Sequence, residues 1–322
     1  MVIDVKSLHV RFKTENGVVH AVNGVDFSIG KGESFCLVGE SGCGKSVTAL
    51  SVMGLLPETS SWVEGGEIMF MGENLLDKSK PEMRHIRGNK ISMIFQEPMT
   101  SLNPVYKIGE QIMEALLAHS EISRKDAARK SVQMLESVRI PDPEKRFNEY
   151  PHCLSGGMRQ RVMIAMALIC QPELLIADEP TTALDVTIQA QILRLINDLQ
   201  GESGTALLLI THDLGVVAEI ADKVAVMYTG MIVESAPVKD LYKTPLHPYT
   251  RGLIKSIPHI DAPLGTKRKL PVIEGSVPSL VNLPSGCTFK ERCPSAVEKC
   301  AYEIPPMIEK DNTHKVRCWL YV

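Results

Sequence analysis

Residues 34–56 read SFCLVGESGCGKSVTALSVMGLL, and this stretch decides the fold. It opens with a short apolar run typical of a buried β-strand, and residues 47–56 have the apolar periodicity of a helix. Between them, Gly39-Glu40-Ser41-Gly42-Cys43-Gly44-Lys45-Ser46 fits the pattern G-x4-G-K-[ST]. A glycine-rich turn between a strand and a helix is the context in which this pattern binds phosphate. The stretch therefore predicts an α/β fold that binds a nucleotide.

The glycines of this loop let consecutive backbone N–H groups turn toward one anion, assisted by the positive end of the following helix. Lys45 is expected to reach the β- and γ-phosphates of ATP, and the Ser46 hydroxyl is expected to ligate Mg²⁺. Cys43 is interpreted as a small residue that the loop tolerates. The residues predicted to bind ATP here are Gly39, Glu40, Ser41, Gly42, Cys43, Gly44, Lys45, Ser46 and Val47.

A second motif, ELLIADE at residues 173–179, consists of an apolar strand followed by two carboxylates. The strand delivers Asp178 and Glu179 at its carboxyl end, where α/β sheets bind ligands. Asp178 is expected to hold Mg²⁺ through water. Glu179 is expected to orient and deprotonate the attacking water.

Apolar strands and helical segments alternate along residues 1–240. Strands are predicted at 3–10, 21–29, 174–177 and 206–210, and helical periodicity covers 107–140 and 187–200. Continuous apolar strands alternating with helices indicate a mostly parallel sheet covered on both faces. We therefore predict one α/β domain over residues 1–240.

Charge and hydropathy limit the environments of the chain. The formal net charge of −3 argues against a general nucleic-acid-binding protein, which needs a basic surface. The first residues lack the basic start and apolar run of a secretory signal. The longest apolar run, Val162 to Cys170, is far shorter than the ~18 residues that cross a bilayer. We expect a cytosolic chain whose membrane association comes through a partner.

The composition changes near residue 237, and the residues from 237 to 322 hold 11 of the 20 prolines. Residues 241–322 are therefore predicted to form an appended, loop-rich module. This tail carries Cys287, Cys293, Cys300 and Cys318. Four thiols in a small cytosolic module suggest a tetrahedral sulfur site, because a metal would compensate for a small core. An iron–sulfur cluster, zinc and unligated or disulfide-bonded thiols all stay open from the spacing alone.

The other cysteines, Cys36, Cys153 and Cys170, lie among apolar or motif-flanking residues and are interpreted as inert core residues. His247, in the stretch Leu246-His247-Pro248-Tyr249-Thr250, is interpreted as structural rather than as a metal ligand.

A third motif, LSGGMRQR at residues 154–161, opens an apolar helix. It stands in order with the two motifs above, with Gln96 in IFQEPMTSLNP, with Ala183-Leu184-Asp185 and with His212 in ITHD. This series resembles the ABC-type ATPases. The resemblance implies a P-loop (RecA-like), mostly parallel sheet with an N-terminal antiparallel β subdomain and a helical subdomain that carries the third motif.

The resemblance also implies roles for single residues. Two such domains would pair head to tail, so that each supplies the other's ATP with Ser155, Gly156, Gly157 and Asp185. His212 would contact the γ-phosphate in its own subunit, and Gln96 would touch Mg²⁺ or the attacking water. Phe12 would stack on adenine.

The sequence around the motifs, together with PLHPYTRGL after them, resembles that of the ATPase subunits of dipeptide, oligopeptide and nickel importers. This implies a peripheral subunit on the cytoplasmic face of the cell membrane, under two transmembrane permease subunits. The implied partners also include a homologous second ATPase subunit, with a heterodimer favoured, and an extracytoplasmic substrate-binding protein, but no nucleic acid. It further implies a [4Fe–4S] cluster on the four tail cysteines, with zinc as the alternative.

One alternative function is the same role for nickel or another solute. Another is a soluble ABC ATPase acting on ribosomes or DNA. The sequence disfavours the soluble class, because the chain holds one ATPase half and 109 residues separate Lys45 from Ser155 without a heptad array.

Overall fold

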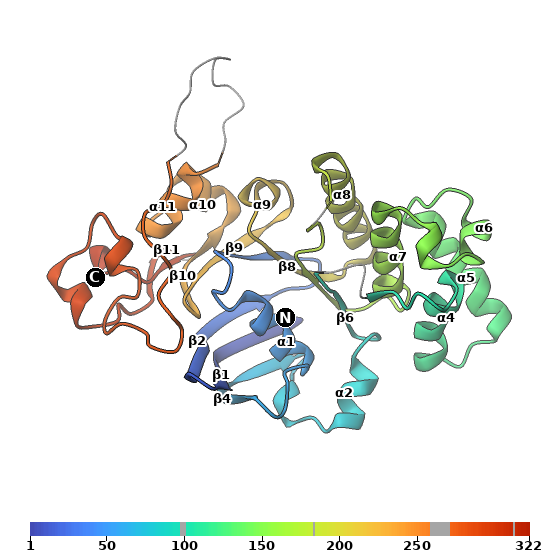
Figure 1. Cartoon of the computed structure of the whole chain (residues 1–322), viewed down its shortest axis with the longest axis horizontal. Helices are drawn as coiled ribbons and strands as arrows, with labels where there is room; N and C mark the ends of the chain where they lie inside the picture. The colour runs from blue at the N-terminus through green and yellow to red at the C-terminus, as the bar shows by residue number, and fades with distance from the viewer. Residues whose placement is uncertain (97–100, 183, 258–270, 312) are drawn as a thin grey trace, which may run out of the picture. The chain divides into compact units, whose positions relative to one another are not determined.

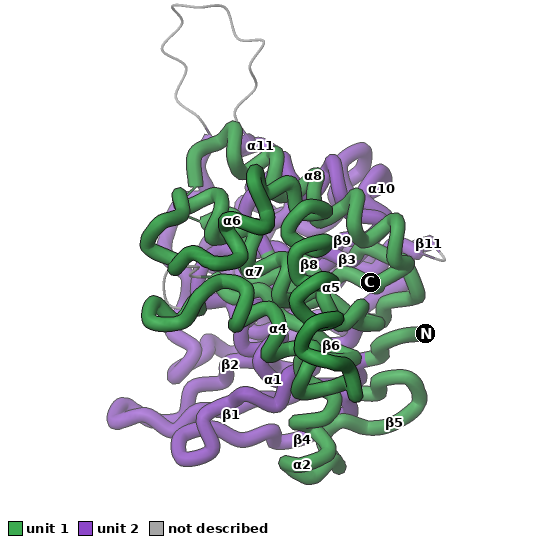
Figure 2. The backbone as a smooth tube through the Cα atoms, turned by 90° about the vertical axis from the view of Figure 1, so that its right-hand side faces the viewer, with its two compact units in different colours: residues 1–4, 28–34, 69–210 green, residues 5–27, 35–68, 211–322 purple. Residues whose placement is uncertain are grey.

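The computed structural model describes residues 1–96, 101–182, 184–257, 271–311 and 313–322. The described residues form two compact units, shown in Figure 2. Unit 1 comprises residues 1–4, 28–34 and 69–210, and unit 2 comprises residues 5–27, 35–68 and 211–322. These are spatial groupings, and the division into a domain over 1–240 and a tail over 241–322 stays a prediction.

Unit 1 is built on parallel strands in the order β6 (Ile91–Ile94), β7 (Leu174–Asp178), β8 (Ala206–Thr211, of which Thr211 belongs to unit 2). All residues of β7 and β8 are buried, as their continuous apolar sequences predict for a sheet covered on both faces. The register places Asp178, the last residue of β7, beside Ile210 of β8. The carboxyl end of β7 therefore presents the predicted acidic pair.

The helices of unit 1 are α2 (Lys80–Ile86), α4 (Ile108–His119), α5 (Arg124–Ser137), α6 (Pro143–Phe147), α7 (Gly156–Leu168) and α8 (Val186–Ser203). The segment predicted as helical over 107–140 is two helices, because Ser123 starts a new one and its hydroxyl accepts the N–H of Asp126 at 3.1 Å. Helices α4 to α7 lie together in Figure 1. This helical group carries the third sequence motif at the start of α7.

Unit 2 contains a run of strands in the order β11 (Ile308–Asp311), β12 (His314–Val316), β10 (Met231–Pro237), β9 (Lys223–Tyr228), β3 (Ser34–Val38, of which Ser34 belongs to unit 1). Strands β3 and β9 are parallel, whereas β10 is antiparallel to both β9 and β12. The tail is thus more than the appended, loop-rich module predicted, because β11 and β12 extend the sheet beyond β10. Residues 307–322 contain no proline, so their backbone N–H groups can pair.

The N-terminal strands are β1 (Ile3–Thr14), β2 (Gly17–Ile29) and β4 (Ser61–Phe70), which lie in the order β2-β1-β4 and extend further than predicted. Most of their residues belong to unit 2. The end of β4 pairs antiparallel with β5 (Glu73–Asn74) in unit 1.

The helices of unit 2 are α1 (Lys45–Met53), α9 (Leu214–Ile220), α10 (Val238–Lys243) and α11 (Pro248–Lys255). Short 3₁₀ turns occur in unit 1 at Leu75–Asp77 and Pro151–Cys153, and in unit 2 at Lys290–Arg292, Glu298–Ala301 and Trp319–Tyr321. Tail residues pack on the sheet through aromatic rings: the centroid of Phe289 lies 5.3 Å from that of Tyr228 and 5.4 Å from that of Tyr249. Across the described parts of the chain, no helix combines the length and apolar character needed to cross a membrane.

Candidate active site

The predicted site residues divide between the two units, and each set is described by itself. Unit 2 holds the glycine-rich loop with Phe12 and His212, and unit 1 holds Gln96, the acidic pair and the third motif.

The loop between β3 and α1 has a backbone that only glycine fits at two positions. Gly39 and Gly44 have φ values of 153° and 104°. A Cβ atom on Gly39 would lie 2.2 Å from the carbonyl oxygen of Met227, and one on Gly44 would lie 2.3 Å from that of Ala21. The loop is therefore packed against the backbone of β9 and β2, which fixes its path.

Lys45 begins α1, and its side chain folds back over the loop with only 5% of its surface exposed. Its Nζ donates hydrogen bonds to the carbonyl oxygens of Gly39 at 2.8 Å and Glu40 at 3.1 Å. Gly44, the N-cap of α1, has no side chain to occupy the first N–H groups of the helix. A buried ammonium and a helix N-terminus beside one turn form an electropositive site suited to an anion.

Cys43 is buried in this loop, and burial raises the pKa of its thiol, so the thiol is neutral near pH 7. This agrees with its interpretation as a small residue. Ser46 and Val47 are half-buried in the first turn of α1.

In unit 1 the carboxylate of Glu179 is held by two neutral donors. The Nε2 of Gln96 and the hydroxyl of Thr182 each donate a hydrogen bond to Oε2 of Glu179, at 3.1 Å. Glu179 has a φ of 45°, which is uncommon and strained for a residue with a side chain. Its N–H donates to the carbonyl oxygen of Ile210 at 2.9 Å, so β8 holds the strained backbone in place. Gln96 and Glu179, predicted separately, meet here.

The third motif and the segment after the acidic pair each contain the N-cap of a helix. Ser155 caps α7 by accepting the N–H of Met158 at 3.3 Å, and Asp185 caps α8 by accepting the N–H of Ile188 at 2.9 Å. Both caps are exposed.

Gly156 and Gly157 follow Ser155 at the start of α7. A Cβ atom on Gly157 would lie 3.0 Å from the Ile188 side chain, and one on Gly156 would lie 3.8 Å from Leu184. The two helix starts are therefore packed against each other and face outward as one surface.

Further predictions concern contacts with ATP and Mg²⁺. Phe12 lies near the end of β1 and is half-buried, and His212 follows β8 and is exposed. Their contacts with ATP stay predictions, as does the ligation of Mg²⁺ by Ser46, Gln96 and Asp178. Oxygen donors of these types are the ligands that Mg²⁺ prefers.

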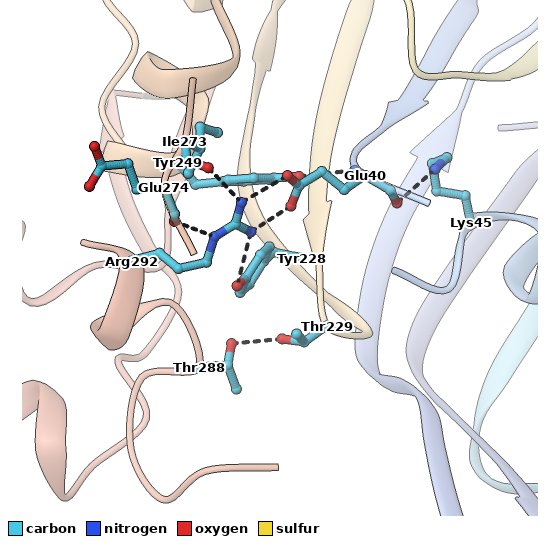
Figure 3. Close-up of polar contacts among 9 residues, drawn as sticks. All are labelled: Glu40, Lys45, Tyr228, Thr229, Tyr249, Ile273, Glu274, Thr288 and Arg292. Carbon is cyan, nitrogen blue, oxygen red and sulfur yellow. Dashed lines mark hydrogen bonds and ion pairs between the residues drawn. The ribbon is translucent and has the colours of Figure 1, made fainter. Parts of the chain in front are cut away.

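Sequence reasoning missed that the tail reaches the loop, as Figure 3 shows. The guanidinium of Arg292 donates to both carboxylate oxygens of Glu40, at 2.6 and 2.9 Å. The N–H of Glu40 donates to the hydroxyl of Tyr249 at 2.9 Å. Tyr249 belongs to the quoted LHPYT stretch, which was the only sequence signal near this contact.

His247 is a buried N-cap of α11, and its Nδ1 accepts the N–H of Tyr249 at 3.1 Å. Burial, with a smaller effect of Arg251, lowers its pKa to about 3, so the imidazole is neutral. The structural interpretation of His247 is confirmed.

The four tail cysteines are free thiols. Burial, with smaller effects of the neighbouring Cys300, Cys318 and Cys293, raises the pKa of Cys287 to about 11, so the four thiols lie within electrostatic reach of one another. Among the residues that the structure describes, however, no three His, Cys, Asp or Glu side chains gather closely enough to hold a metal ion.

Backbone hydrogen bonds reach three of these thiols. Burial raises the pKa of Cys287, Cys293 and Cys318, and a hydrogen bond from the backbone two residues later, at Phe289, Ser295 and Leu320 respectively, acts in the opposite direction. These hydrogen bonds favour the thiolates but do not outweigh burial, so the three thiols are neutral near pH 7.

The interpretation of Cys153 as a core residue is wrong. Cys36 is buried and Cys170 is half-buried, but Cys153 is exposed. It ends the 3₁₀ turn Pro151–Cys153, which leads into the exposed cap Ser155 and so stays at the surface.

Comparison with known proteins identifies the chain. Residues 22–182 match the family described as ABC transporter, and residues 233–300 match the oligopeptide/dipeptide transporter C-terminal region. The chain belongs to the ATP-binding proteins of ABC transporters. The loop, the acidic pair and the LSGGMRQR motif are accordingly parts of an ABC-type ATPase.

Two curated relatives of this ABC ATPase align along nearly its whole length. A probable peptide ABC transporter ATP-binding protein of Sinorhizobium fredii is 56% identical over 319 residues, covering 99% of this chain and 95% of the relative. The dipeptide transport ATP-binding protein DppD of Bacillus subtilis is 52% identical over 319 residues, covering 99% and 94%.

Solved structures confirm the α/β cassette fold. A dimeric ATP-binding cassette in a post-hydrolysis state, bound to ADP and Pi, has a TM-score of 0.65 and 27% identity, covering 73% of this chain and 98% of that one. A dimeric bacterial ABC transporter cassette has a TM-score of 0.65 and 28% identity, with the same coverage.

Proposed function

We propose that this ABC ATPase hydrolyses ATP to energise the import of dipeptides and oligopeptides across the cytoplasmic membrane. The observation that carries the proposal is the pairing of a complete set of nucleotide motifs with a tail that matches the oligopeptide/dipeptide transporter C-terminal region over residues 233–300. The names of the relatives from Sinorhizobium fredii and Bacillus subtilis support the same substrate class.

ATP binding falls to the loop in unit 2. The buried ammonium of Lys45 supplies a positive charge to the β- and γ-phosphates, and the first N–H groups of α1 add the helix dipole. Ser46, Gln96 and Asp178 offer oxygen donors to Mg²⁺, which supplies charge neutralisation to the phosphates when bound. Phe12 would contribute stacking to the adenine ring.

Hydrolysis is assigned to Glu179, with His212 contacting the γ-phosphate. The two hydrogen bonds from Gln96 and Thr182 to one carboxylate oxygen support this role, because they fix the direction of the group before water arrives. A positioned general base contributes a factor of roughly 10²–10⁴ in rate.

The second ATPase subunit is proposed to face the N-termini of α7 and α8. Ser155 and Asp185 cap these helices and are exposed, so their surface is available to a nucleotide held by a homologous partner. The dimeric state of the two solved cassettes supports this pairing.

The permease subunits are proposed to dock on a groove in unit 1. A cavity of about 710 Å³ is lined by α4 and the segment before it, with the exposed side chains of Tyr106 and Leu117 at its surface. Exposed apolar side chains beside a groove are typical of a protein-binding surface. Leu117→Asp should prevent co-purification with the permeases and leave ATP binding intact. Leu55→Asp, at an exposed residue outside the groove, is the control and should keep both co-purification and ATP binding.

The tail is proposed to hold a metal centre, as a [4Fe–4S] cluster or zinc, on Cys287, Cys293, Cys300 and Cys318. A centre bound by four thiolates would staple a module with a small core. Protein purified without air should be brown and contain iron and sulfide, whereas one zinc per chain in a colourless protein would reject the cluster. Cys318→Ser should lose the metal. Cys153→Ser should keep it, because this exposed thiol lies outside the tail.

The catalytic assignment is tested with Glu179→Gln in the complex with the permeases. The variant should bind ATP with unchanged affinity and lose turnover by roughly 10²–10⁴-fold. Glu202→Gln, an exposed glutamate on α8, is the matched control and should retain wild-type turnover. Unchanged turnover of Glu179→Gln would reject Glu179 as the general base.

The transport assignment is tested by reconstituting the complex in vesicles and adding candidate binding proteins. A binding protein loaded with dipeptide or oligopeptide should stimulate ATP hydrolysis and drive uptake of the peptide. Stimulation only by a nickel-loaded binding protein would show that nickel, and not a peptide, is the transported solute. Failure of any permease to co-purify would favour a soluble ATPase.

A further inference from the structure

The guanidinium of Arg292 lies beside the phosphate-binding loop, and all its donors are hydrogen-bonded. Nη1 and Nη2 form the two-pronged contact with Glu40, and the remaining donors reach the hydroxyl of Tyr228 at 3.4 Å and the carbonyl oxygens of Ile273 at 3.3 Å and Glu274 at 3.1 Å. All five N–H groups of the guanidinium are therefore engaged. Only 5% of the Arg292 side chain is exposed, so the contact is largely shielded from water.

Aromatic rings of the sheet and tail support this contact. The Cζ atom of Arg292 lies 5.8 Å from the ring centroid of Tyr228 and 5.9 Å from that of Phe289, at cation–π distance. The hydrogen bonds with Glu40, and to a smaller extent its charge, raise the pKa of Arg292 and so favour the charged guanidinium. A charge-assisted, two-pronged and shielded pair is among the stronger hydrogen-bonded contacts in proteins.

The tail fixes the backbone of Glu40 as well as its side chain. The N–H of Glu40 is held by the Tyr249 hydroxyl at 2.9 Å, and its carbonyl oxygen accepts from Nζ of Lys45 at 3.1 Å. Through its N–H and its carbonyl group, Glu40 therefore links α11 of the tail to the ammonium of Lys45 (Figure 3).

The contact also neutralises the negative charge of Glu40 in the phosphate-binding loop. Glu40 places a carboxylate in a loop that binds a polyanion, with 30% of its side chain exposed. An unpaired carboxylate there would repel the phosphates and compete for Lys45, whereas the guanidinium of Arg292 neutralises it.

We propose that Arg292 is a positioning residue for ATP: from the C-terminal tail it neutralises Glu40 and holds the phosphate-binding loop in its anion-binding conformation. The tail is then part of the nucleotide site. This inference rests on the proposed ATP-binding function of the loop.

The test is a titration of the purified full-length chain with a fluorescent ATP analogue, alongside thermal unfolding. Arg292→Gln should raise the Kd about tenfold, the loss expected when a charged hydrogen-bonded pair is broken. Arg292→Lys, which keeps the charge but loses the fork, should have an intermediate Kd. In the Arg292→Gln background, Glu40→Gln should recover part of the affinity, because it removes the unpaired carboxylate.

The matched control is Arg317→Gln. Arg317 is a half-buried tail arginine whose guanidinium donates to the carbonyl oxygens of Ile232 and Pro305, at 3.2 and 3.3 Å, and not to the loop. It should lower thermal stability without changing the Kd.

An unchanged Kd in Arg292→Gln, an equal rise in Arg317→Gln, or no recovery with Glu40→Gln would overturn the inference. If Arg292→Gln does not fold, the comparison of Arg292→Lys with Arg317→Gln decides in the same way. Failure of the wild-type chain to bind the analogue would instead overturn the proposed function itself.

Discussion

The carboxylate of Glu234 is completely buried in β10 and joins this strand to two parts of the tail, the start of α11 and β12. Its Oε1 accepts the N–H of Leu246 at 2.7 Å and lies 2.8 Å from Nε2 of His314, and its Oε2 accepts the N–H of His247 at 2.8 Å. We predict that Glu234→Gln destabilises the chain although it barely changes the side-chain volume.

The magnitude follows from counting donors. A glutamine offers one oxygen and one NH₂ group, so in either orientation one of the two backbone N–H groups of Leu246 and His247 would face another donor. A buried donor without an acceptor costs about 1–3 kcal/mol, and this range is the expected loss in the free energy of unfolding. Glu234→Ala removes every acceptor and leaves a cavity, so its loss should be about twice as large or more.

The assay is urea denaturation followed by circular dichroism, with the midpoint compared at unchanged slope. Glu309→Gln, at an exposed glutamate of β11, is the control and should change the free energy by less than about 0.5 kcal/mol. A Glu234→Gln variant as stable as this control would refute the reasoning, because the buried N–H groups would then have no need of the carboxylate.

Three further predictions concern other described residues. Burial lowers the pKa of His247 from 6.5 to about 3, so only the unfolded chain binds this proton as the pH falls below 6.5. The free energy of unfolding should therefore decrease from pH 6.5 toward 3, by up to about 1.4 kcal/mol per pH unit. Urea midpoints measured over this pH range should lose this dependence in His247→Asn. Gly44→Ala should abolish ATP binding in a nucleotide titration, because its Cβ would lie 2.3 Å from a backbone oxygen, whereas Gly42→Ala meets nothing within 4 Å and should retain measurable binding. Alkylation of the native chain by iodoacetamide, followed by mass spectrometry, should label the exposed Cys153 well before Cys36, whose thiol pKa is raised by burial; equal labelling would contradict the assigned exposure.

Predictions succeeded where the signal is local. The strands at 174–177 and 206–210 and the helix after Lys45 are found as expected, because continuous apolar runs and glycine spacing constrain neighbouring residues directly. The helical segment over 107–140 was less well predicted, because its division depends on the cap at Ser123 rather than on apolar periodicity.

The candidate site shows the same limit. Sequence order identified Gln96 and Glu179 as site residues, but their 3.1 Å hydrogen bond depends on the placement of β6 beside β7. Cys153 was misassigned because an apolar neighbourhood in sequence does not reveal that a short turn lies at the surface.

By itself, the sequence determined the phosphate-binding loop, the acidic pair and the class of ATPase, because each motif lies within one strand, turn or helix. Only the tertiary structure decided that the tail adds strands to the sheet and that Arg292 clamps Glu40. Those two residues are 252 positions apart, and no local pattern encodes a pairing over that distance. The contact depends on how β10, β12 and the aromatic rings of the tail pack, which is a property of the folded chain as a whole.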